Sequence, residues 1–229
     1  MRHIASCITL LLIAAASVAV PLREGPNKGW GDFVDPDKDC QFKVEAGKLT
    51  ITVPGTDHDL GIERGKMNAP RAWQIIEGDF TIEVKVSGVF APVDMNNQDR
   101  RAYHGAGFII HGDDRTYVRL DRATYWDGSA NQVYANFELR KDGKIDRFGL
   151  PEDLRIESGK DTWLKIQRKG NQFFGHATQE EGKWHDLGNK TIDLPAKLRI
   201  GVAAINTSLQ SFAPVFSELK IDVPKDVDR

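Results

Sequence analysis

Cysteine is almost absent from this chain, with 2 in 229 residues. Cys7 lies in an apolar N-terminal segment, which leaves Cys40 alone in the rest of the chain. A single cysteine forms no internal disulfide, so the fold must be held by its hydrophobic core. We expect Cys40 to be buried as a small hydrophobic residue rather than to act as a nucleophile, because nothing near it in the sequence would lower its pKa.

The chain also lacks an excess of either charge. It carries 31 Lys and Arg against 33 Asp and Glu, a net charge of -2, which excludes a nucleic-acid-binding surface spread over the whole chain. With 40% hydrophobic and 28% charged residues, it is neither a disordered chain nor a multi-span membrane protein. It contains no Gly-x-Ser-x-Gly elbow, no phosphate-binding loop and no His-Glu-x-x-His motif.

One long apolar run is present, at residues 4–20, and Arg2 precedes it. Ser17-Val18-Ala19 fits a small-x-small cleavage site, so residues 1–19 are predicted to be a signal peptide that is cut after Ala19. An uncleaved membrane anchor is the alternative, because the run reaches the lower end of spanning length. We expect a secreted, periplasmic or cell-surface protein that has no membrane segment once the signal is removed.

The remainder of the chain alternates apolar and polar residues with a period of two. In residues 80–86, Phe80, Ile82, Val84 and Val86 alternate with polar residues, and the same pattern recurs at 49–53, 118–120, 137–139, 164–166, 198–202 and 219–223. Each such segment is predicted to be a strand with one buried face. Asp142-Gly143 and Gly170-Asn171 are typical hairpin turns. Residues 26–224 are therefore predicted to form one all-β domain, a two-sheet antiparallel sandwich, with loops at 93–102 and 145–160.

Several short motifs carry a family resemblance. They are N-A-P-R at 68–71, G-D-F at 78–80, G-A-G-F at 105–108 and E-G-K-W at 181–184. Together they resemble the DUF 1349 family, also called the regulation-of-enolase family, which is similar in fold to the concanavalin A-like lectins and glucanases. The resemblance implies a jelly-roll sandwich. It implies a carbohydrate-related role only by analogy, because the family has no settled activity.

Strand parity indicates a candidate binding face. If Val118, Leu120, Phe137 and Leu139 point into the core, their neighbours share the other face of the sheet. That face would offer flat rings, amides, carboxylates and a guanidinium, the mixture that a sugar or similar polyol needs. The predicted ligand-binding residues are Tyr117, Arg119, Asp121, Tyr134, Asn136 and Glu138, with Tyr125 and Trp126 at the rim. Cross-strand ion pairs on a solvated sheet, such as Glu138 with Arg119, would explain the charged residues equally well.

Two other functions stay open beside non-covalent carbohydrate binding. Asp121 and Glu138 are the candidate catalytic pair of a sugar-modifying or glycoside-cleaving enzyme, although the Glu-x-Asp-x-x-Glu strand of the related glucanases is absent. The same aromatic residues could instead form a protein-interaction surface. His104 and His111 are interpreted as structural histidines, and Trp73 is placed in the core because Ile75 shares its parity.

No metal site and no cofactor is predicted. Asp35, Asp37 and Asp39 alternate as in a calcium loop, but Cys40 and Ala46 stand where the EF-hand pattern requires Gly and Glu. A solvated turn is the simpler interpretation, and a calcium site completed by distant ligands is the weaker alternative.

The signal-peptide interpretation predicts a defined N-terminus. Expression in a secreting host should give an exported protein that begins at Val20, because the small residues Ser17 and Ala19 fit the signal peptidase site. Intact-mass measurement and N-terminal sequencing check this. An Ala19→Phe variant should be processed poorly. An exported protein that keeps Met1 would contradict the prediction.

Overall fold

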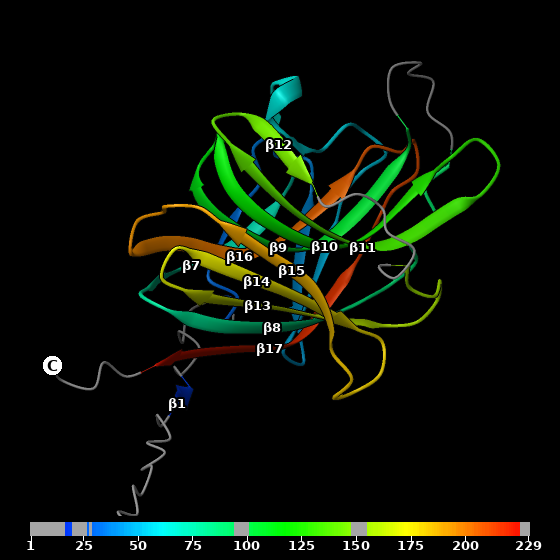
Figure 1. The fold of residues 1–229 in the computed structure, drawn as a ribbon. Coiled ribbons are helices and arrows are strands. Elements are labelled where there is room, and N and C mark those ends of the chain that lie inside the picture. Colours follow the sequence, from blue (N-terminus) through cyan, green and yellow to red (C-terminus); the bar gives the residue numbers. More distant parts are fainter. Residues whose placement is uncertain (1–16, 20–26, 28, 94–100, 148–154, 225–229) are drawn as a thin grey trace, which may run out of the picture.

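The computed structural model describes residues 17–19, 27, 29–93, 101–147 and 155–224 (Figure 1). The predicted signal peptide lies largely outside these residues. Its last three residues form β1 (Ser17–Ala19), which pairs with the end of β17 (Val215–Pro224). No helix in the described part of the chain is long and apolar enough to cross a membrane.

The first of two large sheets is antiparallel and has eight strands, counting β1. Its main path runs in the order β15-β14-β13-β8-β17-β4-β3. The bounds of its remaining strands are β3 (Gln41–Glu45), β4 (Lys48–Thr52), β8 (Phe80–Ser87), β13 (Thr162–Lys169), β14 (Gln172–Thr178) and β15 (His185–Thr191).

The second large sheet is antiparallel and has seven strands, in the order β12-β11-β10-β9-β16-β7-β2. It packs face to face on the first sheet, as Figure 1 shows, so the predicted two-sheet sandwich is confirmed. Its strands are β2 (Asp32–Val34), β7 (Arg71–Glu77), β9 (Tyr103–Asp113), β10 (Thr116–Trp126), β11 (Asn131–Lys141), β12 (Lys144–Arg147) and β16 (Lys197–Asn206).

Both predicted hairpin turns are present. Asp142 (φ 53°) and Gly143 (φ 77°) lie in the left-handed region and join β11 to β12, as a tight two-residue hairpin requires. Gly170 (φ 57°) begins the equivalent turn between β13 and β14. Residues 145–160, expected as a loop, instead begin inside β12, because the chain continues to pair with β11 after the Asp142-Gly143 turn.

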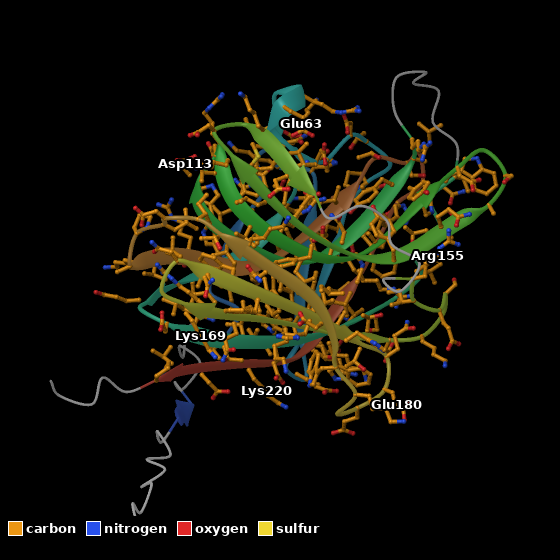
Figure 2. All side chains as sticks on the ribbon, in the orientation of Figure 1. Glu63, Asp113, Arg155, Lys169, Glu180 and Lys220 are labelled. Atoms are coloured by element: carbon orange, nitrogen blue, oxygen red, sulfur yellow. The ribbon has the colours of Figure 1, made fainter. Side chains whose placement is uncertain are left out.

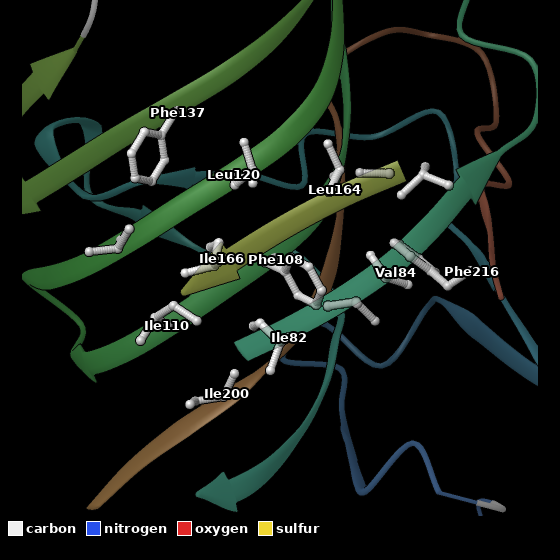
Figure 3. Close-up of a cluster of buried hydrophobic side chains, with 14 of the residues drawn as sticks. Ile82, Val84, Phe108, Ile110, Leu120, Phe137, Leu164, Ile166, Ile200 and Phe216 are labelled. Carbon is white, nitrogen blue, oxygen red and sulfur yellow. The ribbon is translucent and has the colours of Figure 1, made fainter. Parts of the chain in front are cut away.

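The core fills the space between the two sheets, and Figure 3 shows its central side chains. The alternation read from the sequence places them there, since every second residue of each strand faces inward. The labelled members are Ile82, Val84, Phe108, Ile110, Leu120, Phe137, Leu164, Ile166, Ile200 and Phe216.

The outer face of the seven-stranded sheet carries a second, smaller apolar cluster. Residues 58–70, here called the covering segment, cross this face and contain β5 (Leu60–Gly61), the 3-10 helix η1 (Ile62–Arg64) and β6 (Lys66–Met67). Leu60 and Ala69 of the covering segment pack against Ile109, Tyr117 and Ile205 of the sheet. The sheet is therefore packed on both sides over part of its area.

The packing of the main core gives a stability prediction. Phe108 is 1% exposed and lies in the main cluster, so Phe108→Ala should lower the free energy of unfolding by about 3–5 kcal/mol through lost burial and the cavity left behind. Urea unfolding measures the change. Gln172→Ala, at an exposed position of β14, serves as the control, and a loss no larger than that of the control would contradict the packing.

Candidate functional site

The register of β10 and β11 places the predicted site residues on one face. Arg119 lies opposite Glu138, Asp121 opposite Asn136, and Ala123 opposite Tyr134. Because Val118, Leu120, Phe137 and Leu139 belong to the main core, their neighbours face the other way. The predicted shared outer face is therefore confirmed.

The expectation that this face is open to solvent is wrong for most of its residues. The side chains of Tyr117 and Glu138 are 0% exposed. The physical reason is the covering segment, which lies on the sheet; the Tyr117 hydroxyl, for example, donates a hydrogen bond to the backbone carbonyl of Leu60 at 2.7 Å. The residues that are buried and not solvated are Tyr117, Arg119, Asp121, Tyr134, Asn136 and Glu138.

A network of ion pairs occupies the middle of the outer face. Arg119 contacts Asp121 through Nε to Oδ2 at 2.7 Å and Glu138 through Nη2 to Oε1 at 2.9 Å. Arg140 also pairs with Glu138, and Asn136 donates from Nδ2 to Glu138 Oε2 at 3.1 Å. Pairing with an opposite charge offsets part of the cost of burying each of these groups. The cross-strand interpretation of Glu138 with Arg119 is therefore confirmed.

The network extends to the covering segment through Glu63. Arg140 donates from Nε to Glu63 Oε2 at 2.8 Å and from Nη2 to Oε1 at 3.1 Å, a two-point contact that fixes the orientation of both groups. Partial burial opposes ionisation of Glu63, but Arg140 outweighs it and holds the pKa of Glu63 below its usual value. This ion pair ties η1 to β11.

Burial changes the acidity of two groups in the network. It raises the pKa of Asp121 from 3.8 to about 6, although Arg119 acts in the opposite direction. Burial also raises the pKa of the Tyr117 hydroxyl to about 12, so this hydroxyl stays protonated and continues to donate to Leu60 at neutral pH.

The candidate catalytic pair shares one guanidinium group. Asp121 and Glu138 lie on neighbouring strands and face the same side, as the enzyme hypothesis requires. However, Arg119 contacts both carboxylates, so a cation lies where two glycosidase carboxylates would flank a sugar bond. In this arrangement both carboxylates are counter-ions of Arg119 within the packed outer face.

The two residues predicted at the rim, Tyr125 and Trp126, are more exposed than the central residues, since both are only partly buried. Tyr125 lies between Tyr103 of β9 and Gln132 of β11 in one cross-strand row on the outer face. The Tyr134 ring packs edge-on against the Tyr125 ring, with the ring centroids 5.9 Å apart. Trp126 follows Tyr125 in the regular ladder of β10 and so faces the opposite side of the sheet. The rim of the outer face is therefore the row Tyr103, Tyr125 and Gln132, with Tyr134 beside it.

Tyr103 and Gln132 were missed in the sequence. The signal for Tyr103 was present in the G-A-G-F motif, because Tyr103 has the same parity as Gly105 and Gly107. A Cβ on Gly105 would lie 2.6 Å from the Tyr103 ring, so the glycine lets the ring lie close against the strand. The Tyr103 ring thus fills the space that the missing side chain of Gly105 leaves.

The histidines have structural environments. His104 is buried and stacks on Phe212 with ring centroids 4.2 Å apart, and burial lowers its pKa to about 4. His111 Nε2 contacts Asp114 Oδ1 at 3.0 Å. Burial lowers the pKa of His111 as well, although Asp114 acts in the opposite direction.

The assignment of Trp73 to the core is wrong. Trp73 is half-buried on the outer face, where the guanidinium groups of Arg71 and Arg199 lie 4.8 and 5.4 Å from its ring centroid. Ile75, which shares its parity, is 56% exposed. Trp73 and Ile75 do lie on the same face of β7, as the alternation predicts. That face is the outer one, because Ile75 is an exposed apolar residue and not a core residue.

The acidic turn at 35–40 is closed by its own hydrogen bonds. Asp35 accepts the backbone N–H of Lys38 and of Cys40. His58 Nε2 lies 2.8 Å from Asp39 Oδ1, a hydrogen-bond distance. Asp39, Cys40 and His58 place potential ligand atoms within 4.8 Å of one another, but burial and the nearby acids raise the pKa of the Cys40 thiol, which disfavours the thiolate that binds metals.

Solved structures share this fold at low sequence identity. A functionally unknown protein from Saccharomyces cerevisiae is 16% identical over 85% of this chain and 97% of its own, with a TM-score of 0.64. A xylan β-1,4-xylosidase from Bacillus halodurans C-125 is 15% identical over 90% of this chain and 42% of the enzyme, with a TM-score of 0.56. The CBM2 module of an evolved Dit protein of Lactobacillus casei BL23 phage J-1 is 13% identical over 82% of this chain and 81% of its own, with a TM-score of 0.50.

No family model and no curated protein matches the chain. The DUF 1349 resemblance therefore remains a sequence-based expectation. What these structures share with the chain is the fold, an all-β sandwich of two antiparallel sheets.

The buried carboxyl of Asp121 gives a pH-dependent prediction. The folded protein holds this proton up to about pH 6, whereas the unfolded chain loses it near 3.8. Folding therefore takes up a proton between these values, so the wild type should lose about 2–3 kcal/mol of stability relative to Asp121→Asn as the pH rises from about 4 to 6.

Urea unfolding of both proteins at several pH values measures this difference. The contribution of His104 has the opposite sign, because its folded pKa is depressed, but it is common to both proteins and cancels. A stability difference that is constant over this pH range would contradict the raised pKa of Asp121.

Proposed function

We propose that this protein binds carbohydrate non-covalently at the rim of the outer face, through Tyr103, Tyr125 and Gln132. The observation that carries the proposal is their cross-strand row at one end of the seven-stranded sheet, where all three side chains are partly exposed. An aromatic ring can pack on the C–H face of a sugar, and a planar amide can bond its hydroxyls. The fold resemblance to carbohydrate-binding modules supports the same ligand class.

The row is held in place before any ligand arrives. The Arg101 guanidinium lies 5.0 Å from the centre of the Tyr125 ring, and Tyr134 packs on its edge. Asp127 accepts hydrogen bonds from the backbone of Ser129 and Ala130 in the β10–β11 turn and from Gln132 Nε2. These bonds, with that from the Ser129 hydroxyl, lower the pKa of Asp127 to about 2. Side chains that are already ordered lose less entropy on binding.

The buried network behind the row has a supporting role in this proposal. Arg119 Nη2 lies 3.5 Å from the Tyr103 hydroxyl, so the ion pairs of β10 and β11 extend to the first ring of the row. Tyr117, Asp121, Asn136 and Glu138 then position the sheet and contact no ligand. Export, as predicted from residues 1–19, would bring the rim to extracellular or cell-surface glycans.

Substitution of Tyr125 tests the proposal. Affinity electrophoresis in gels containing soluble xylan or xyloglucan should show retardation of the wild type. Tyr125→Ala should weaken binding about tenfold, because it removes a ring that would stack on the sugar. Thermal unfolding should show that the variant is folded.

Trp126→Ala is the matched control, because Trp126 lies on the same hairpin and faces the opposite side. It should bind as the wild type does. Unchanged binding in Tyr125→Ala, or equal losses in both variants, would contradict a site on the outer face.

A further inference from the structure

A pocket of about 510 Å³ lies between the two sheets at the β11–β15 side of the sandwich. It is separate from the rim and shares no side chain with it. Figure 2 labels Arg155 and Glu180, both of which line it. Pockets that hold small ligands usually have volumes of about 300–1,000 Å³, so this one is large enough for a sugar.

The floor of the pocket is apolar and its walls are polar. Ala135, Ala177 and Leu187 are buried side chains that face inward from β11, β14 and β15, and Ile156 joins them. Because Ala135, Ala177 and Leu187 close the pocket from behind, the partly exposed Ile156 supplies the apolar surface that can accept the C–H face of a sugar ring.

The wall formed by residues 157–160 is fixed by hydrogen bonds. Gln179 accepts the backbone N–H of Glu157 at 2.7 Å and donates to the backbone carbonyl of the same residue at 2.9 Å. Arg122 donates to the carbonyl of Lys160 from the interior. On the opposite side, the Ile156 N–H bonds the Val133 carbonyl of β11. The pocket is therefore preformed.

Among the described residues that line the pocket, the charged side chains form two ion pairs and leave one arginine. Lys160 pairs with Glu157 at 2.8 Å and Lys183 pairs with Glu180 at 2.6 Å. Arg155 also lines the pocket, and no carboxylate among the described residues forms an ion pair with its guanidinium. Each of the two ion pairs is neutral, so Arg155 supplies the remaining positive charge among the described lining residues.

We propose that this pocket binds a carboxylated sugar, with Arg155 as the partner of its carboxylate. A guanidinium group matches a carboxylate with two parallel hydrogen bonds. The apolar floor receives one face of the ring, and the carboxylates of Glu157 and Glu180 lie at the walls as acceptors for its hydroxyls. The ligand class is a uronic acid or an oligosaccharide that ends in one.

An NMR titration of protein with labelled Ala and Leu methyl groups tests this inference. D-glucuronate should shift the methyl signals of Ala135, Ala177 and Leu187, whereas D-glucose and acetate should bind at least about tenfold more weakly, because each offers only part of the recognised chemistry. Arg155→Gln should weaken glucuronate binding about tenfold through loss of the charge-assisted contact. Arg64→Gln, at an exposed arginine of η1, is the matched control and should bind as the wild type does.

The outcomes separate this site from the rim. Tyr125→Ala should leave the glucuronate titration unchanged, so loss of rim binding and loss of pocket binding are distinguishable. Four results would overturn the inference: no shift of the pocket methyl groups, equal affinity for glucose, equal affinity for acetate, or an unchanged titration of Arg155→Gln. The same spectra report whether each variant is folded.

Discussion

The Arg119 guanidinium lies between Asp121 and Glu138, and the organisation of the outer face depends on it. Without this cation, two carboxylates on neighbouring strands would be buried with too little compensation. With it, β10 and β11 can carry charged side chains beneath a packed covering segment. Arg140, two residues after Glu138 on β11, likewise lies between two carboxylates, those of Glu138 and Glu63. The inner face of the seven-stranded sheet therefore packs against the hydrophobic core. Part of its outer face is buried as well, with charged side chains that form ion pairs.

In the proposed function, this arrangement places recognition at the end of the sheet and not at its centre. The covering segment occupies the middle of the outer face, where a flat and open sheet would have offered its polar side chains to a ligand. The end of the sheet stays partly accessible, and Tyr103, Tyr125 and Gln132 lie there in one row. The buried pairs then act as a rigid base for that row, since Arg119 reaches the Tyr103 hydroxyl.

The sequence predicted the fold and the face of the sheet on which the candidate residues lie. It did not predict whether those residues are exposed to solvent. Alternation in β10 and β11 correctly placed Tyr117, Arg119 and Glu138 on one face, because alternation is a local property of the strand. Whether that face meets water depends on residues 58–70, which contact it over about 60 residues of sequence separation. No local pattern encodes such a contact. The pocket was missed for the same reason, since Ala135 and Ala177 line it from different sheets and come together only when the sheets pack.

Strand β11 takes part in both proposed sites. Tyr134 faces the rim, and its neighbour Ala135 faces the pocket between the sheets. Ligands at the two proposed sites would therefore contact neighbouring residues of one strand. Thermodynamic linkage makes any coupling between the two sites reciprocal: a ligand that changes the affinity of the second site by some factor has its own affinity changed by the same factor.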